Sequence, residues 1–239
     1  MCSNYRPATS SQRLLTFFGV EAGPDRRAGD VFPTGGAPFI RLTREGTEGG
    51  EPALLVEDGL FGLLPHFATE VAYGRRTYNA RSETVAKLAS FKLAWAHGQR
   101  CVIPAEHIYE PNWETGKAVR WKIFQAGDVP FGIAGIYRRW KNPTGGELNT
   151  FAMLTVNADG HPVMSRFHAP GKEKRMVVIL DRAEYMDWLT CPVDQAPRYF
   201  RQWPGELLAE PAPLDRVRKA APEPPQAAGE LFGDSDGST

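Results

Sequence analysis

The sequence predicts an α+β fold made of a single β-rich domain with a few peripheral helices. The main observation is a series of short runs, rich in β-branched and aromatic residues and bounded by turn residues, as is typical of strands. The length of 239 residues and the hydrophobic content of 42% are ordinary for a globular domain. The predicted strands cover residues 100–105, 119–125, 131–140, 151–156 and 175–180.

Apolar spacing and end signals predict the remaining elements. Residues 10–19 and 82–98 each begin with serine and end with glycine, and apolar residues recur between them at helical spacing. A third helix is expected from Asp181, because Glu184 three residues later completes a capping box. The pair Asp58-Gly59 separates two apolar runs, which predicts a hairpin turn.

The last part of the chain has a different composition. Residues 208–239 are rich in Pro, Ala, Gly and acidic residues, so we expect a domain over 1–207 and a flexible acidic tail over 208–239. Within this tail, residues 229–233 (GELFG) are a candidate peptide-docking motif. From Glu206 onward the chain has seven acidic and three basic residues, which leaves a net charge of +4 on the part before it. A mildly basic body permits nucleic-acid binding without demanding it.

Other classes are disfavoured by composition. No apolar run approaches the roughly 18 residues that a membrane span needs, and the start lacks the layout of a secretory signal. The three cysteines are scattered, which fits neither a disulfide framework nor a zinc site. We therefore expect a cytoplasmic protein without metal or other cofactor and without membrane contact.

Cys2 is the first candidate for chemistry, because removal of Met1 would leave a free amine and a thiol on adjacent carbons. Such a pair reacts with an aldehyde, first to an imine and then to a five-membered thiazolidine. An α-amine titrates near about 7.7–8.0, so a useful fraction is already nucleophilic at neutral pH. Position alone favours a frayed terminus with an accidental cysteine.

Three further segments offer polar groups between the predicted elements. Asn79 and Arg81 precede the helix expected from Ser82, where they suit either a reacting centre and a phosphate or a simple turn. Glu106 and Glu110 lie on a predicted loop after a strand, and Glu110 has aromatic neighbours that would raise its pKa. An exposed hairpin glutamate is the alternative.

The segment 156–176 holds His161 and His168, and histidine is the natural proton shuttle at neutral pH. Prolines exclude the regular helix that a zinc motif requires there. Basic and aromatic residues also interleave over 73–81 and 136–141, a mixture that suits single-stranded nucleic acid or an exposed strand.

The order of these segments resembles the SOS response-associated peptidase (SRAP) family. The resemblance covers roughly residues 1–205 and rests on the initial MC, on NARSET, CVIPAEHIYE and FGIAGIY, and on the Met-x-x-x-His loop before RMVVIL. It implies a compact, barrel-like core of mixed or antiparallel strands with flanking helices. It also implies a sensor of abasic sites in single-stranded DNA that forms a thiazolidine crosslink through its N-terminal cysteine.

The resemblance assigns roles to residues of this chain. It implies that Cys2 is the covalent residue and that Asn79, Glu110 and His168 complete the site, with His161 in the preceding turn. It further implies a group of DNA-binding residues, in which arginines grip phosphates and an aromatic ring stacks beside the missing base; these are Arg81, Arg175 and Phe67, with Arg6 as a further candidate.

This chain departs from the family pattern at three places. The usual opening MCGRY is MCSNY here, so the arginine expected at position 4 is absent, and Arg6 is one candidate to replace it. The tryptophan that usually follows the glutamate is Pro111. Residues 169–174 separate His168 from Arg175. These changes leave the chemistry of Cys2 intact and bear on the DNA contacts.

The resulting hypothesis is an abasic-site crosslinking protein of the DNA damage response that acts as a monomer on single-stranded DNA. It would have an autopeptidase-like removal of Met1 and a Schiff-base, lyase-type activity. Two other interpretations remain open. One is a cysteine autopeptidase or thiol hydrolase that uses Cys2, His168 and Glu110, and the other is a non-catalytic module that binds single-stranded DNA.

Overall fold

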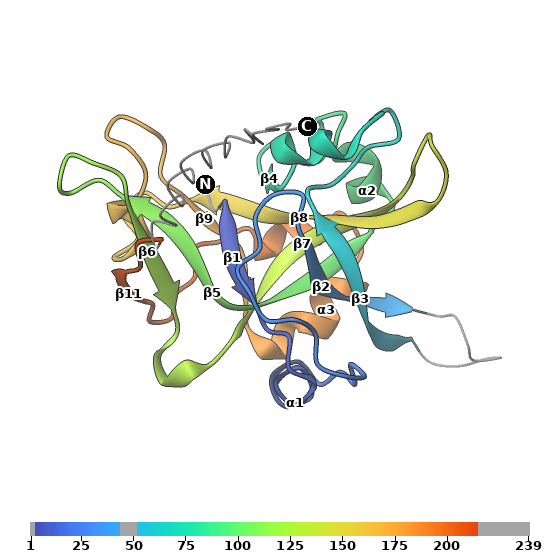
Figure 1. Ribbon diagram of the computed structural model, residues 1–239, viewed down its shortest axis with the longest axis horizontal. Coiled ribbons are helices and arrows are strands. Elements are labelled where there is room, and N and C mark those ends of the chain that lie inside the picture. Colours follow the sequence, from blue (N-terminus) through green and yellow to red (C-terminus); the bar gives the residue numbers. More distant parts are fainter. Residues whose placement is uncertain (1–2, 44–51, 215–239) are drawn as a thin grey trace, which may run out of the picture.

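The protein is built around a strongly curved β-sheet that closes on itself (Figure 1). The computed structural model describes residues 3–43 and 52–214. Within these residues the strands are β1 (Asn4–Pro7), β2 (Gly36–Thr43), β3 (Ala53–Phe61), β4 (Asn79–Arg81), β5 (Arg100–Asn112), β6 (Val119–Phe124), β7 (Phe131–Lys141), β8 (Glu147–Asn157), β9 (Arg175–Val177), β10 (Ile179–Leu180) and β11 (Leu208–Pro211).

Five strands form a closed mixed barrel. Strand β2 pairs with β3, β3 with β8, β8 with β7, β7 with β5, and β5 returns to β2. Only the β3–β8 contact in this ring is parallel. The long strand β5 leaves the ring and continues between β1 and β6, so its second half lies beside the start of the described chain. The expected barrel-like α+β core is confirmed.

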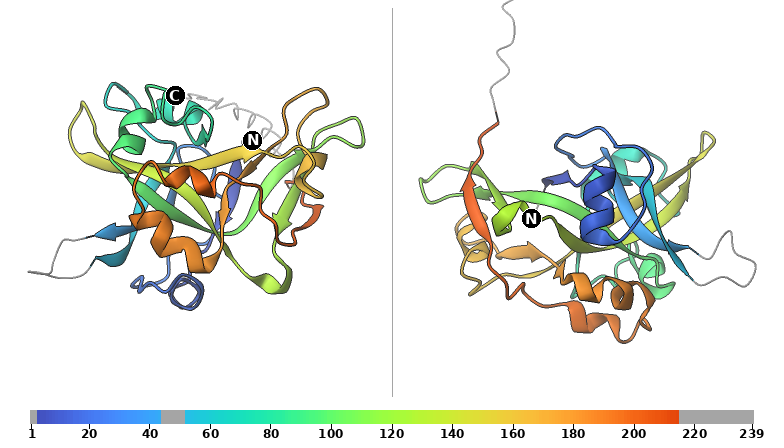
Figure 2. Two further views of the ribbon diagram at one scale, coloured as in Figure 1. Left: turned by 180° about the vertical axis from the view of Figure 1, so that it is seen from behind. Right: turned by 90° about the horizontal axis from the view of Figure 1, so that it is seen from below.

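The helices are short and lie outside the barrel. In Figure 1 α1 lies at the lower end of the barrel, and the back view in Figure 2 shows α3 on the face behind it. The α-helices are α1 (Ser11–Arg13), continued by a π-helical turn over Leu14–Phe18, α2 (Lys92–Ala96) and α3 (Tyr185–Thr190). None of the helices in the described part of the chain is long and apolar enough to cross a bilayer.

Aromatic side chains fill the barrel. Four fully buried rings form a row in the order Tyr5, Phe61, Phe151 and Phe39. The centroids of neighbouring rings in this row lie 5.3–5.7 Å apart. Packed rings of this kind resist local deformation, because cores are as dense as organic crystals. The strands that carry the polar site residues therefore stand on a rigid base.

The predicted strands are present, and β5, β7 and β8 extend further than expected. Strand β5 runs on through Glu110 to Asn112, so the expected loop after residue 105 is wrong and Glu110 lies on a strand. The segment 175–180 is divided into β9 and β10, which pair with different partners. The capping box at Asp181 and Glu184 is confirmed, since the Asp181 carboxylate accepts the Ala183 N–H at 3.0 Å and the Glu184 carboxylate accepts the Asp181 N–H at 2.9 Å.

The hairpin expected at Asp58-Gly59 is wrong, because β3 passes straight through both residues. Asp58 lies opposite Pro38 and Gly59 opposite Ala37 in the pairing with β2. A Cβ atom at Gly59 would come within 2.8 Å of the Phe39 ring. Glycine is needed here for close packing in the barrel and not for a turn.

The long helix expected over 82–98 is also wrong. Residues 82–91 form successive turns in which i→i+3 and i→i+4 hydrogen bonds alternate, and only α2 is a regular helix. Of the apolar residues at helical spacing, Val85, Phe91 and Trp95 are buried, whereas Leu88 is 49% exposed. Three of the four expected core positions are therefore confirmed, and their burial does not require a continuous helix.

The described chain continues past the expected domain boundary at residue 207. Leu208–Pro211 form β11, which pairs with the edge strand β6, and the description ends at Leu214. The first residues assigned to the tail thus pair with the sheet, and the flexible tail itself stays a prediction. The GELFG motif at 229–233 lies outside the described residues.

Candidate functional site

Glu110 is a carboxyl group inside the protein. It sits near the end of β5, opposite Trp121 of β6, and its side chain is 1% exposed. Burial raises its pKa to about 7, because an ionised carboxylate is poorly solvated there. At neutral pH this group therefore exchanges a proton readily in either direction.

His168 reaches Glu110 from the loop before β9. Its Nε2 lies 3.3 Å from Oε2 of Glu110. Its backbone has a φ of +70°, in the left-handed region that a side chain other than glycine rarely adopts. Three contacts hold this conformation: the His168 N–H donates to the carbonyl of Pro111 (3.0 Å), and the Lys174 ammonium donates to the carbonyls of Phe167 (2.7 Å) and His168 (3.0 Å).

The two side chains have opposite pKa changes with one cause. Burial lowers the pKa of His168 to about 4, so the imidazole is neutral at neutral pH, while Glu110 is raised to about 7. The pair is therefore suited to hold a single proton on its carboxyl side. A strained backbone at such a pair is typical of a functional site and not of a structural ion pair.

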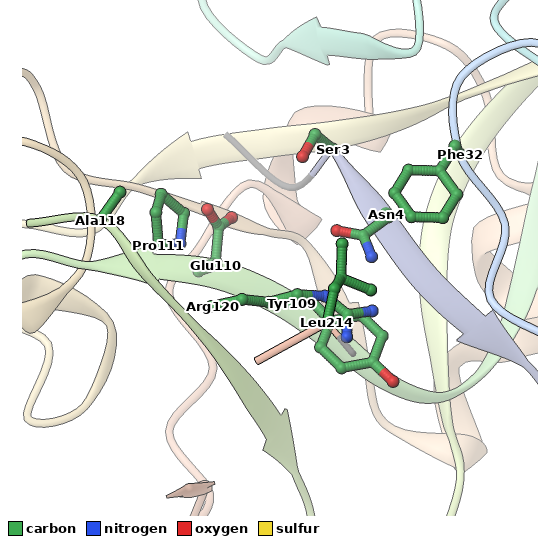
Figure 3. A pocket seen from close by; sticks show the side chains of 9 residues that line it. All are labelled: Ser3, Asn4, Phe32, Tyr109, Glu110, Pro111, Ala118, Arg120 and Leu214. Atoms are coloured by element: carbon green, nitrogen blue, oxygen red, sulfur yellow. The ribbon is translucent and has the colours of Figure 1, made fainter. Parts of the chain in front are cut away.

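A pocket of about 280 Å³ opens beside Glu110. Figure 3 shows the Glu110 carboxyl pointing toward Ser3, the first described residue, with Asn4 next to it. The exposed side chains of Phe32 and Leu214 lie at its rim. Its lining residues are Ser3, Asn4, Phe32, Tyr109, Glu110, Pro111, Ala118, Arg120 and Leu214.

Cys2 itself lies outside the described residues. Its neighbour Ser3 precedes β1, which runs antiparallel to β5 with Asn4 opposite Tyr109. Consecutive Cα atoms are about 3.8 Å apart, so chain connectivity alone keeps the Cys2 Cα within that distance of the Ser3 Cα. Ser3, the next residue in the sequence, lines the same pocket as Glu110, and the covalent role expected for Cys2 stays a prediction.

Asn79 and Arg81 lie on β4, which pairs in parallel with β8. Asn79 is buried opposite Met153, whereas the side chain of Arg81 is 46% exposed and pairs with Glu173 at 2.9 Å. An exposed guanidinium with one carboxylate partner keeps donors available for a phosphate. The roles expected for both residues stay predictions.

Arg175, the other arginine expected to grip phosphate, is in a different situation. Its side chain is 2% exposed and forms ion pairs with Glu83 (2.9 Å) and Glu173 (2.7 Å). It also donates to the carbonyl (2.6 Å) and hydroxyl (3.0 Å) of Thr155. In this structure Arg175 joins β9 to β8 and to the turn after β4, and a phosphate would have to displace these partners.

The other two expected DNA contacts differ in exposure. Phe67 follows β3 and is 45% exposed, with its ring edge-on to Tyr73 at 5.8 Å. A large exposed ring is available for stacking on a base. Arg6 on β1 is partly exposed and donates to Asp30 from Nε (2.9 Å) and Nη2 (2.7 Å).

Two polar residues near the site turn out to be structural. Nδ1 of His161 accepts the backbone N–H groups of Val163 and Met164, both at 3.1 Å, and its Nε2 faces the carbonyl of Trp203 at 3.1 Å. Glu106 is held by Arg13 at 2.5 Å. Each of these two segments offered two candidates, Glu106 or Glu110 and His161 or His168. The structure brings Glu110 and His168 into contact.

Sequence reasoning missed a polar cluster at the opposite wall of the pocket. The Asp30 carboxylate accepts hydrogen bonds from Arg6, Arg120 and the hydroxyl of Tyr109. Arg120 and Tyr109 come from neighbouring strands, and only the register of β5 against β6 would have revealed that they meet. In the described residues no group of three or more His, Cys, Asp or Glu side chains is placed to hold a metal ion.

Comparison with protein families decides the relationship of this chain. A family model described as SOS response associated peptidase (SRAP) matches residues 1–214. The chain belongs to the SRAP family. The match ends at the last residue that the structure describes, in agreement with β11 being part of the domain.

Curated relatives of this SRAP chain carry informative names. It is 30% identical over 142 residues to the abasic site processing protein YoqW of Bacillus subtilis, which is 59% of each chain. It is 28% identical over 178 residues to the abasic site processing protein HMCES of Gallus gallus, covering 64% of this chain and 50% of that protein. The aligned parts thus span between half and three-fifths of these relatives.

Solved structures agree with the SRAP fold. A crystal structure of a protein from Bordetella bronchiseptica superposes with a TM-score of 0.78 at 36% identity, covering 89% of this chain and all of that one. A protein from Bacteroides thetaiotaomicron gives a TM-score of 0.73 at 20% identity, covering 92% of this chain and 95% of that one. The second likeness concerns the fold alone.

Proposed function

We propose that this SRAP protein recognises abasic sites in single-stranded DNA and crosslinks to them through Cys2 after Met1 is removed. The observation that supports this most is the buried Glu110–His168 pair, because Glu110 lines the same pocket as Ser3, the residue that follows Cys2 in the sequence. Membership of the SRAP family and the names of the curated relatives support abasic sites as the substrate.

The proposed reaction needs no redox partner. The neutral amine of Cys2 adds to C1′ of the ring-opened deoxyribose, and the carbinolamine loses one water to give an imine. The thiol sulfur then adds to the imine carbon while its proton passes to the nitrogen. The product is a thiazolidine, and one water is released overall. An earlier hydrolysis, by the protein itself or by an aminopeptidase, releases Met1.

The buried pair supplies the protons for these steps. Glu110, with a pKa of about 7, donates a proton to the departing hydroxyl of the carbinolamine and recovers one later. Neutral His168 moves a proton at the ring oxygen when the sugar opens. Asn79, buried on β4, would orient the amine or the backbone of Cys2. These roles rest on position and on chemistry.

The DNA contacts are proposed from exposure. Arg81 would hold a phosphate beside the lesion, Phe67 would stack next to the missing base, and Arg6 would contact the strand near the pocket. Arg175 would support Arg81 indirectly, because both bind Glu173. The protein would act as a monomer in the cytoplasm, at the nucleoid when DNA is damaged.

A denaturing gel tests the proposal directly. Processed protein is incubated with single-stranded DNA that contains one abasic site, and a heat-resistant retarded band is expected. The band should be absent with intact DNA and when Met1 is retained. Cys2→Ala keeps the amine, so it should give a borohydride-trapped imine but no heat-stable adduct. Absence of any crosslink with processed protein would refute the function.

The same protein preparations distinguish the other interpretations. A thiol hydrolase would cleave peptides other than its own leader without any aldehyde. A simple binding module would show salt-sensitive affinity for single strands that Cys2→Ala leaves unchanged.

A further inference from the structure

Arg120 lies in the wall of the pocket, across from Glu110 (Figure 3). It is carried by β6 and stands opposite Pro111 of β5. Its guanidinium carbon is 3.2 Å from the centre of the Tyr109 ring, and its Nη2 donates to Asp30 at 2.6 Å. A stacked and paired guanidinium is fixed in position and in orientation.

Asp30 in turn is fixed from three sides. It accepts from Arg6 at 2.7 Å, from Arg120 at 2.6 Å and from the Tyr109 hydroxyl at 3.1 Å. The hydrogen bonds from both arginines help to lower the pKa of Asp30 against its burial, so it stays ionised. These contacts therefore hold the Arg120 guanidinium in one orientation, directed toward β1.

Asn4, the first residue of β1, meets this fork. The amide orientation that turns its oxygen toward Arg120 gives hydrogen bonds of 3.1 Å from Nε and 2.7 Å from Nη2. The reverse orientation would set N–H donors against N–H donors. Asn4 is 4% exposed, so this contact is shielded from water.

The remaining donor of Arg120 is also engaged. Nη1 donates to the carbonyl of Ala212 at 3.2 Å, in the segment that follows β11. The side chain is 17% exposed. Its donors thus face protein acceptors on three sides, which favours a role in holding the protein over direct capture of a phosphate.

We propose that Arg120 is a positioning residue that holds Asn4, and with it the start of β1, in register beside Glu110. The proposal rests on the proposed function only for its effect on rate. An asparagine at position 4 is short, and a guanidinium from β6 reaches it. The Asn4–Arg120 contact thereby fixes the backbone two residues from the reacting amine.

Hydrogen exchange without DNA tests the structural half. The Tyr5 N–H donates to the carbonyl of Val31 at 3.1 Å and reports on the attachment of β1. In the Arg120→Ala variant the Tyr5 N–H should exchange with solvent at least about tenfold faster than in the unmodified protein. The Met153 amide, bonded to Tyr78 at 2.9 Å inside the barrel, should be unchanged, which shows that the opening is local.

Lys122→Ala is the matched control. Lys122 lies two residues along β6 and pairs with Glu210 of β11 at 2.7 Å, without a described contact to Asn4. It removes a cation from the same strand, so it should leave exchange at Tyr5 as in the unmodified protein. Equal exchange in Arg120→Ala and the unmodified protein would overturn the proposal.

Kinetics test the consequence for the reaction. At saturating abasic DNA, Arg120→Ala and Asn4→Ala should each slow crosslinking by about 10- to 100-fold, because a small misplacement of a reacting group has this effect. The Kd for intact single strands should change by less than about twofold. The double variant should be no slower than the slower single variant, since both remove one contact.

Two results would contradict this. A weaker Kd with an unchanged rate at saturation would make Arg120 a phosphate contact, and additive effects in the double variant would separate it from Asn4. If Arg120→Ala does not fold, Asn4→Ala carries the same measurements. If the unmodified protein forms no crosslink, the proposed function fails. Hydrogen exchange at Tyr5 still decides whether Arg120 holds the start of β1 in place.

Discussion

Nε2 of His168 lies 3.3 Å from Oε2 of Glu110, in a part of the protein that excludes water from both groups. The same burial that raises the pKa of the acid lowers the pKa of the base. The two therefore approach a state in which one proton is shared near neutral pH. A left-handed backbone at His168 accompanies this contact, and strained backbone of this kind clusters at functional sites.

Replacement of Glu110 by glutamine tests the proton transfer. Glu110→Gln keeps the shape of the side chain but cannot donate and recover a proton, so crosslinking should slow by about 10²–10⁴-fold. In the unmodified protein the pH–rate profile should be bell-shaped: the rate rises as the amine of Cys2 loses its proton and falls on the alkaline side, above about pH 7, where Glu110 has lost its own. The variant should lack this decrease in a pH–rate profile at saturating DNA.

Glu106→Gln is the control on the same strand. Its carboxylate is bound by Arg13 at 2.5 Å and is not part of the pocket lining. It should keep both the rate and the decrease near pH 7. A profile of Glu110→Gln that matches the unmodified protein would remove Glu110 from the mechanism.

The same substitution should change how stability depends on pH. Glu110 loses its proton near 4.5 in the unfolded chain but near about 7 when folded. As the pH rises between these values the unfolded state is favoured, by up to about 3 kcal/mol, and the loss is complete above pH 7. Glu110→Gln avoids it, so its advantage in the free energy of unfolding should grow from about pH 5 to about pH 8 in urea titrations. A constant difference would contradict the raised pKa.

His168 and His161 should respond in opposite ways. Asparagine tolerates the left-handed backbone, so His168→Asn should keep the melting temperature while the crosslinking rate falls by about 10²–10⁴-fold. His161→Ala removes the acceptor of two backbone N–H groups and should lower stability by about 1–3 kcal/mol with the rate per folded molecule unchanged. Thermal denaturation and single-turnover gels separate the two effects.

Measurements of stability and of DNA binding should also distinguish the two arginines expected to bind phosphate. Arg81→Ala removes an exposed cation, so stability should change by less than about 1 kcal/mol while the salt dependence of binding to single strands weakens by about one charge. Arg175→Ala leaves the buried carbonyl and hydroxyl oxygens of Thr155 without this donor and should lower stability by about 1–3 kcal/mol. Equal stability losses in both variants would contradict the difference in burial.

Truncation locates the end of the domain. Removal of everything after residue 207 deletes β11 and exposes the edge of β6, so the melting temperature should fall by about 2–8 °C. Removal of everything after residue 214 should leave it within about 1 °C, since all pairing to β6 is retained. Circular dichroism melts of the two truncations against the full chain measure this difference.

The strands from β5 to β10 could be predicted from sequence, because β-branched and aromatic runs between turn residues have few other ways to be buried, whereas β1, β2, β4 and β11 were not predicted. The errors arose where one signal has two causes. Asp58-Gly59 is a turn signal, yet Gly59 is required by the ring of Phe39, which is distant in the sequence. The apolar spacing over 82–98 reports one buried face, which a series of turns provides as well as a helix does.

The site was predicted in part. The residues His168 and Glu110 came from the family resemblance, and their 3.3 Å contact depends on the left-handed turn at His168, which no local pattern indicates. The cluster of Asp30, Tyr109 and Arg120 joins three segments far apart in the chain. No sequence pattern indicates that these three residues meet, because their contact depends on the register of the sheet.

The pairing of β1 with β5 also fixes how many residues separate the sheet from the start of the chain. Asn4 is fixed opposite Tyr109, and a strand advances about 3.4 Å per residue while its side chains alternate between faces. Under the proposed function, one residue inserted between Cys2 and Asn4 would leave Asn79, Glu110 and His168 unchanged and would lengthen the segment that joins Cys2 to β1. Such a variant should keep its stability and crosslink more slowly.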